Sequence, residues 1–350
     1  MTFQEILQNA VEKRASDIIL VVGLPVAYKI SGVITRDGER ILPPMMSDLL
    51  EQAYALAKRP MDTLLESGDD DFSFGLPQMA RFRVNTLRQR GTYGMVIRLV
   101  SFALPDPGQL GIPERIMNMA SYTHGLVLIT GAAGSGKTTS LACMVDRINS
   151  TRNAHVVTIE DPIEYLHHHK KSVVTQRELS LDTKDYQTAL RAALREVPDV
   201  ILVGEMRDAE TIRAAVTAAE TGHLVLSTLH TIGAANTIDR IIDSFDSRQQ
   251  QQIRTQLAQV LEGVVSQQLV IGQDGGLIPA FEIMTMTNAA RNMIRESKAH
   301  QLDNLIATSA SAGMISMDQS LLELVHDNRM SKEEAVRRAA DEDWVRKKLL

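Results

Sequence analysis

Residues 125–138 read Gly-Leu-Val-Leu-Ile-Thr-Gly-Ala-Ala-Gly-Ser-Gly-Lys-Thr, and this stretch decides the fold. Its second part, from Gly131 to Thr138, matches the phosphate-binding pattern G-x-x-x-x-G-K-[ST]. The apolar run 125–130 before it is typical of a buried parallel strand. After the loop, apolar residues recur at helical spacing, namely Leu141, Met144, Val145 and Ile148. The order strand, loop, helix is the one that phosphate binding requires, whereas a glycine-rich turn without a ligand needs no such order.

Each fixed position of the loop has its own physical role. Glycines at the first and sixth positions allow tight turns and a close approach of backbone to phosphate. Successive N–H groups at a helix N-terminus form an anion-binding concavity. We therefore expect ATP and Mg²⁺ as cofactors, with the lysine on the β- and γ-phosphates and the threonine hydroxyl on the metal. The expected nucleotide contacts are Gly131, Gly134, Ser135, Gly136, Lys137, Thr138 and Thr139.

Composition limits the class of protein. The 350 residues predict about two domains, and the 44% apolar and 23% charged content is ordinary for a globular protein. No run of 18 apolar residues and no secretory signal is visible, so we expect no membrane insertion. A net charge of −6 argues against a general electrostatic grip on nucleic acid. The single cysteine, Cys143, excludes an intrachain disulfide and a multi-cysteine zinc site.

The pattern of elements predicts two domains joined by a linker. Residues 105–113 carry three prolines and two glycines, which place a linker at 101–115. Before it, residues 1–100 read as a small α+β domain, with a helical stretch at 45–67 and strands at 17–22, 26–34, 72–74, 80–86 and 93–100. After it, apolar runs at 125–130, 155–159, 200–203 and 224–229 alternate with helical stretches. This α/β alternation predicts a parallel sheet in an ATPase core at 116–272, followed by a helical region at 273–350.

Polar residues follow the predicted core strands, and ligands bind beyond the carboxyl ends of parallel strands. Glu160, Asp161 and Glu164 follow one strand, Glu205 follows another, and His230 follows a third, with His223 just before it. Carboxylates there can hold Mg²⁺ or accept a proton from an attacking water. Any single one of them is as well explained as a helix cap or a solvated loop residue.

Five segments together resemble the secretion ATPase superfamily, and within it the type IV pilus retraction ATPases of the PilT family. They are the phosphate loop and residues 158–164, 203–208, 219–223 and 227–231, which resemble that family's Walker A, Asp box, Walker B and His box motifs. The resemblance extends to residues 15–17 and 317–321, and so over nearly the whole chain. It implies a homohexameric ring, an N-terminal PAS-like domain and a C-terminal RecA-like core.

The resemblance also assigns roles to individual residues. Glu205 resembles the metal-holding acid, and Glu164 the catalytic base. His223 and His230 resemble sensors of the γ-phosphate. Arginines from the N-terminal domain are implied to face the nucleotide, and these are Arg81, Arg83 and Arg98. A solvated basic strand face is the alternative for the arginines.

Two segments differ from the sequence that is usual in the family. Ala132-Ala133 replaces Pro-Thr in the loop, which leaves the backbone cradle intact. Residues 289–302 resemble the family's Ala-Ile-Arg-Asn-Leu-Ile-Arg-Glu signature, with Ala290 in place of isoleucine. The segment carries no group suited to phosphate chemistry. We therefore expect loss of Arg291 or Arg295 to spare hydrolysis and to abolish coupling, although a packed amphipathic helix also explains the pattern.

The implied protein is a cytoplasmic ATPase motor at the inner face of the cytoplasmic membrane. It acts on an inner-membrane pilus platform protein, so that pilin leaves the fibre and the cell twitches. An accessory retraction ATPase and a pilus assembly or secretion ATPase remain alternatives. A RecA-like nucleic-acid translocase would need a basic, aromatic-bearing loop, and none is visible. A non-catalytic nucleotide-gated scaffold disagrees with the intact motif residues.

Overall fold

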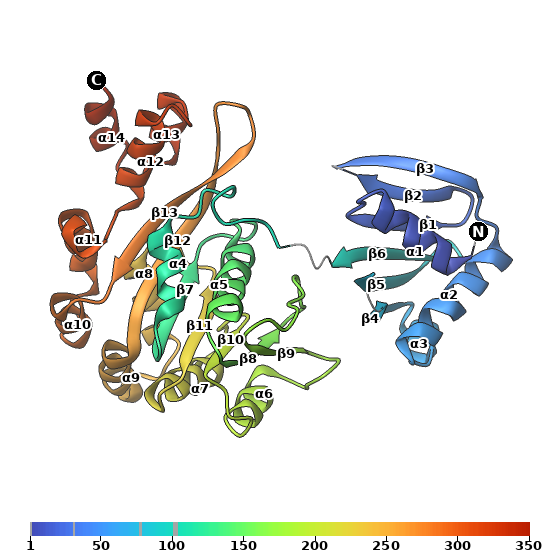
Figure 1. Cartoon of the computed structure of the whole chain (residues 1–350), viewed down its shortest axis with the longest axis horizontal. Coiled ribbons are helices and arrows are strands. Elements are labelled where there is room, and N and C mark those ends of the chain that lie inside the picture. Colours follow the sequence, from blue (N-terminus) through green and yellow to red (C-terminus); the bar gives the residue numbers. More distant parts are fainter. Residues whose placement is uncertain (1, 31, 77–78, 101–103) are drawn as a thin grey trace. The chain divides into compact units, whose positions relative to one another are not determined.

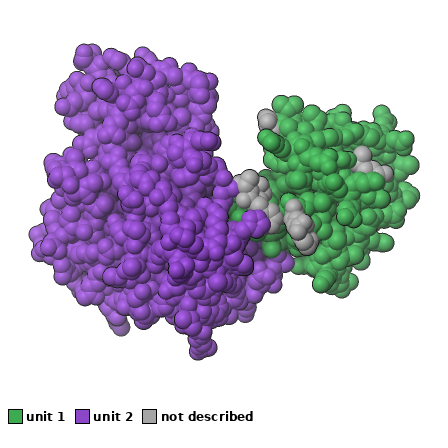
Figure 2. All heavy atoms as spheres, viewed as in Figure 1, with its two compact units in different colours: residues 1–103, 164–166 green, residues 104–163, 167–350 purple. Residues whose placement is uncertain are grey.

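The computed structural model describes residues 2–30, 32–76, 79–100 and 104–350. The chain divides into two compact units (Figure 2). Unit 1 comprises residues 1–103 and 164–166, and unit 2 comprises residues 104–163 and 167–350. Residues 101–103 of the expected linker lie outside the described residues, and residues 104–113 contain turns but no helix or strand.

Unit 1 is built on a six-stranded antiparallel sheet in the order β3-β2-β1-β6-β5-β4 (Figure 1). Its strands are β1 (Asp17–Val21), β2 (Pro25–Ile30), β3 (Val33–Arg40), β4 (Asp69–Leu76), β5 (Ala80–Gln89) and β6 (Thr92–Val100). Its helices are α1 (Phe3–Glu12), α2 (Pro43–Ala57) and α3 (Asp62–Ser67). Their apolar faces, including Leu50 of α2, share one core with alternate strand residues such as Tyr28 and Phe82.

Two expected elements of unit 1 are each divided in two. The expected strand 26–34 is two strands, because the chain turns at Gly32, whose φ of 82° suits glycine. The expected helix 45–67 ends at Ala57, because Lys58 adopts a left-handed conformation and Pro60 cannot continue the helix. The remaining strands lie where the sequence predicts them.

Unit 2 contains a seven-stranded sheet in the order β13-β12-β7-β11-β10-β8-β9. Six strands are parallel, and β13 pairs antiparallel with β12 at one edge. The strands are β7 (Gly125–Thr130), β8 (His155–Glu160), β9 (Val173–Glu178), β10 (Val200–Val203), β11 (Leu224–Leu229), β12 (Leu261–Ile271) and β13 (Leu277–Thr285). Every residue of β7, β10 and β11 is buried, as expected for central parallel strands.

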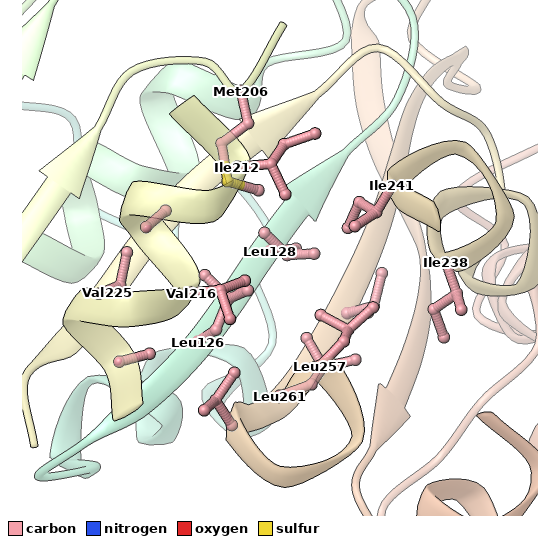
Figure 3. Packing of buried hydrophobic residues seen from close by; sticks show 14 of the residues in the cluster. Leu126, Leu128, Met206, Ile212, Val216, Val225, Ile238, Ile241, Leu257 and Leu261 are labelled. Atoms are coloured by element: carbon pink, nitrogen blue, oxygen red, sulfur yellow. The ribbon is translucent and has the colours of Figure 1, made fainter. Parts of the chain in front are cut away.

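Helices cover both faces of this sheet. Consecutive residues of β7 enter different cores, because side chains alternate along a strand. Leu126 and Leu128 pack with Val216 and Leu257 on one face (Figure 3), whereas Val127 and Ile129 belong to the core of the other face. The helices of this part of the chain are α4 (Glu114–Met117), α5 (Lys137–Thr151), α6 (Tyr186–Ala193), α7 (Ala209–Glu220), α8 (Ala234–Asp243) and α9 (Ser247–Val260), with the 3-10 turn η1 (Asn118–Ser121).

The C-terminal part is helical only after residue 285. The expected helical region from residue 273 begins instead with β13, whose pairing with β12 extends the sheet to Thr285. It continues with α10 (Asn288–Arg295), α11 (Leu302–Thr308), α12 (Met317–His326), α13 (Lys332–Arg338) and α14 (Glu342–Leu349), and with the short turns η2 (Ala299–Gln301) and η3 (Ala310–Ala312). Among the described helices, none is both long and apolar enough to span a bilayer.

Candidate nucleotide site

The phosphate loop joins β7 to α5 in a conformation that glycine permits. Gly131, Gly134 and Gly136 have φ values of 141°, 75° and 87°, where other residues are strained. A Cβ atom on Gly131 would lie 2.2 Å from the carbonyl oxygen of Gln267. Gly136 is the N-cap of α5, so the loop leads directly to the free N–H groups of that helix. The local backbone therefore has the form of an anion site.

Two polar side chains of the loop are buried. The Lys137 ammonium donates to the carbonyl oxygens of Gly131 and Ala132, both at 2.9 Å, and the residue is 7% exposed. Ser135 is 5% exposed, and its hydroxyl has no hydrogen-bond partner in the described chain. A buried polar group without a partner is costly, so this hydroxyl fits a loop that receives a phosphate oxygen. Thr138 and Thr139 lie half-buried in the first turn of α5.

Glu205 and His230 meet at the carboxyl edge of the same sheet. They follow the adjacent parallel strands β10 and β11, and β11 also pairs with β7. His230 Nε2 lies 3.4 Å from Glu205 Oε1, and Arg207 Nε donates to Glu205 Oε2 at 2.8 Å. The Glu205 side chain is 17% exposed, compared with 47% for His230. The hydrogen bond to Glu205 raises the pKa of Arg207.

Glu160 is the last residue of β8, the strand next to β10, and its carboxylate already accepts hydrogen bonds from nearby side chains. Its Oε1 accepts from Thr158 Oγ1 at 2.6 Å and from Gln176 Nε2 at 3.1 Å, and the residue is 8% exposed. Asp161 follows in the exposed loop. Of the two acids, Asp161 is the more accessible from solvent.

His223, which the resemblance assigns as a γ-phosphate sensor, lies away from the phosphate loop of its own chain. His223 precedes β11, and its carbonyl accepts from the N–H of Gly125, at the start of β7. Because β7 and β11 run parallel in register, His223 lies at the edge opposite the phosphate loop. The six residues of β11 separate it from His230 by about 20 Å. Its Nδ1 donates to the carbonyl of Ala218 at 2.9 Å, which caps the end of α7.

The three arginines share one face of the unit 1 sheet. Arg83 lies directly opposite Arg98 across β5 and β6, and Arg81 is two residues earlier on β5. Arg98 forms an ion pair of 3.0 Å with Asp17 and is 67% exposed. Glu164, which is exposed, also belongs to unit 1 in the division above. These four residues and the phosphate loop are thus described in different units.

Sequence reasoning missed Gln267 and Ser140. Ser140 Oγ donates to Gln267 Oε1 at 2.8 Å, and both residues are almost fully buried. The signal in the sequence is a run of three polar residues, Ser266, Gln267 and Gln268, within the otherwise apolar stretch 264–271. Buried polar residues in a central strand indicate a specific partner.

Histidines 167–169 serve the connection between β8 and β9. The N–H of His167 donates to Gln176, and His169 Nδ1 accepts from the N–H of Val174. Within the described ranges, no group of three or more His, Cys, Asp or Glu side chains is arranged to hold a metal ion.

Comparison with known proteins agrees with this geometry. Residues 1–343 match the model of the family described as type II/IV secretion system protein. The chain is 43% identical over 347 residues to the type IV pilus retraction ATPase PilT of Pseudomonas aeruginosa, covering 97% of this chain and 98% of that one. It is 36% identical over 340 residues to the type IV pilus ATPase PilU of the same organism, covering 97% and 89%.

A solved structure gives the same answer. A crystal structure of the pilus retraction motor PilT with bound ADP superimposes with a TM-score of 0.90 at 42% identity and covers 99% of each chain. The α/β fold with two sheets and the family resemblance inferred from the motifs are confirmed. The chain belongs to the type II/IV secretion system protein family.

Proposed function

We propose that this chain is the ATPase motor of a type IV pilus retraction machine. One observation carries the proposal: a phosphate loop with a buried lysine shares a sheet edge with a paired glutamate and histidine. A buried lysine ammonium and free helix N–H groups attract the triphosphate, while an acid beside them serves a metal ion. The similarity over almost the full length to a pilus retraction ATPase supplies the biological context.

The residues present fit Mg²⁺·ATP. Thr138 and Glu205 would hold Mg²⁺, partly through water, and the ion would neutralise charge on the phosphates. Lys137 would contact the β- and γ-phosphates, and the Ser135 hydroxyl would gain the partner that it lacks. His230, next to Glu205, would respond to the γ-phosphate. We assign Glu164 as the general base that orients the attacking water.

The proposal extends to architecture and assembly. Unit 1 is taken as a PAS-like domain and unit 2 as a RecA-like core with a helical C-terminal region. Arg81, Arg83 and Arg98 would complete a nucleotide site in a homohexamer, because a permanently charged fork suits phosphate oxygens. The ring would work in the cytoplasm against an inner-membrane pilus platform protein.

Two other functions within the same superfamily remain as alternatives. An accessory retraction ATPase is the closer one, and the higher identity to the retraction ATPase than to PilU favours the principal motor. A pilus assembly or secretion ATPase would share the site and differ in the direction of fibre movement. A nucleic-acid translocase is disfavoured by the net charge of −6.

A complementation experiment tests the proposal. The chain is expressed in a Pseudomonas aeruginosa strain deleted for its own retraction ATPase, and twitching zones and surface pili are measured. The chain should restore twitching and reduce surface pili, whereas Lys137→Ala should do neither. Full ATPase activity without restored retraction would contradict the pilus assignment. Failure in this strain, together with restored twitching in a strain that keeps its retraction ATPase but lacks PilU, would identify an accessory motor.

A further inference from the structure

The strand β12 extends past the end of β7 and lies against the phosphate loop. The two strands are parallel neighbours (Figure 1), and Ser266 pairs with Thr130, the last residue of β7. Gln267 therefore comes level with Gly131, where the chain leaves the sheet to form the loop. The 2.2 Å from the Gln267 carbonyl oxygen to an ideal Cβ on Gly131 shows how closely the two backbones pack. The start of the loop is thus fixed against β12.

The side chain of Gln267 reaches the other end of the same loop. Its Oε1 accepts from the Ser140 hydroxyl in the first turn of α5. Its Nε2 lies beside Gly136, 2.8 Å from the position of an ideal Cβ on that residue. Gln267 is 4% exposed and Ser140 is 1% exposed, so the hydrogen bond between them is shielded from water. One residue therefore contacts both ends of the loop and the helix that follows it.

The preceding residue on β12 holds the segment after His230. Side chains of consecutive strand residues point to opposite faces. Ser266 Oγ accepts from the N–H of Gly233 at 3.0 Å, and Glu282, opposite Ser266 on β13, accepts from the N–H of Ala234 at 2.8 Å. Two neighbouring residues of β12 thus contact different loops of the site: Gln267 contacts the phosphate loop, and Ser266 contacts the segment that follows His230.

We propose that Gln267 is a positioning residue for nucleotide binding, which holds the phosphate loop in its binding conformation through Gly131, Gly136 and Ser140. The inference rests on the proposed nucleotide site and names a residue outside its motifs. Without this support the phosphate loop would become ordered only when the nucleotide binds. The free-energy cost of that ordering would be subtracted from the binding free energy, so the nucleotide would bind more weakly. Because Gln267 lies on β12, the same contact links the loop to the β12–β13 hairpin, from which α10 follows.

The test is calorimetric titration of the full chain with ADP and Mg²⁺. Gln267→Leu removes the oxygen and the NH₂ of the side-chain amide at similar size. It should raise the ADP dissociation constant about tenfold, which corresponds to the free energy of one buried hydrogen bond. Gln267→Glu keeps an acceptor for Ser140 but puts a carboxylate beside Gly136, so it should weaken binding at least as much. Ser140→Ala added to Gln267→Leu should cost little more than Gln267→Leu alone, because the two residues share one bond.

Ser320→Ala is the matched control. The Ser320 hydroxyl, which is 9% exposed, accepts from the N–H of Phe281 in the same sheet and does not contact the loop. This variant should lower the unfolding temperature and leave ADP affinity unchanged. Gln267 variants that lose stability like the control while binding ADP normally would overturn the inference. A wild-type chain that binds ADP but fails to restore retraction would overturn only the motor function, and one that binds no ADP would overturn both.

Discussion

Replacing Arg291 and Arg295 by alanine should have very different consequences, although they lie one turn apart on α10. Arg291 Nη1 donates to the carbonyls of Ala258 and Gln259 at 2.7 and 2.9 Å, and its Nη2 donates to Glu262 Oε1 at 2.9 Å. Those carbonyls belong to the last turn of α9, where helical partners are missing. Arg295 is exposed, and in the described part of the chain its hydrogen bonds go to Arg291 and Asn292 of its own helix. Arg291 therefore has a structural role in holding the end of α9, in addition to the coupling role expected for both arginines.

The magnitude follows from these contacts. A buried hydrogen bond to a charged group contributes about 1.5–3 kcal/mol to stability. The Arg291 and Glu262 side chains are 21% and 27% exposed, so each of their hydrogen bonds contributes less than the upper value. Arg291→Ala also removes a cation from the C-terminal end of α9. We expect it to lower the free energy of unfolding of unit 2 by about 3 kcal/mol. Arg295→Ala should lower it by about 0.5 kcal/mol or less, as for other exposed substitutions.

Urea denaturation followed by tryptophan fluorescence measures this difference, because the single tryptophan, Trp344, lies in unit 2. Arg295→Ala should then keep about half or more of the ATPase activity, remain hexameric and fail to restore twitching. Hydrolysis is spared because the Arg295 side chain is not expected to take part in phosphate chemistry. Equal stability of the Arg291→Ala variant and the wild type would refute the structural reasoning. Normal twitching by Arg295→Ala would refute a coupling role for α10.

Three further outcomes are expected. Glu164→Gln should bind Mg²⁺·ATP and hydrolyse it at least about 100-fold more slowly. Glu205→Gln should also lose turnover, with a greater change in Mg²⁺ dependence; near-normal rates in both, measured over a Mg²⁺ series, would mean that the roles are misassigned. Light scattering should reveal a hexamer with nucleotide present, and Arg81→Ala should lower turnover more than affinity; a fully active monomer would rule this out. Burial lowers the pKa of His167 to about 4, so its contribution to stability is present at neutral pH and is lost as the pH falls from about 6.5 towards 4. Between pH 7 and 5 the wild type should lose about 2 kcal/mol more than His167→Asn in urea denaturation, and parallel losses would show that His167 is not buried in its neutral form.

The central strands of unit 2 could be predicted because they are apolar throughout. The strands β7, β10 and β11 are buried on both faces, so their sequence alone marks them. The strands β12 and β13 were missed because polar residues interrupt them. Ser266, Gln267 and Glu282 are polar because they hold the loops of the site, a requirement that periodicity does not reveal.

The site was predicted to the extent that it follows from local motifs. The loop conformation depends on glycine spacing, and the meeting of Glu205 with His230 depends on parallel neighbours. His223 and His230 lie at opposite edges of the sheet because the six residues of β11 separate them, and a resemblance between motifs does not convey that separation. Residues that pack against the phosphate loop, such as Gln267, come from a strand that is distant in sequence, and no sequence motif identifies them.

Steady-state phosphate release by the full chain, wild type against Lys137→Ala, tests the central claim most directly. The Lys137 ammonium is buried against the carbonyls of Gly131 and Ala132, where the phosphates are expected to bind. The account predicts Mg²⁺-dependent ATP hydrolysis by the wild type and none above background by Lys137→Ala, since the charge nearest the β- and γ-phosphates is lost. Turnover by Lys137→Ala at the wild-type rate, or none by the wild type, would contradict it.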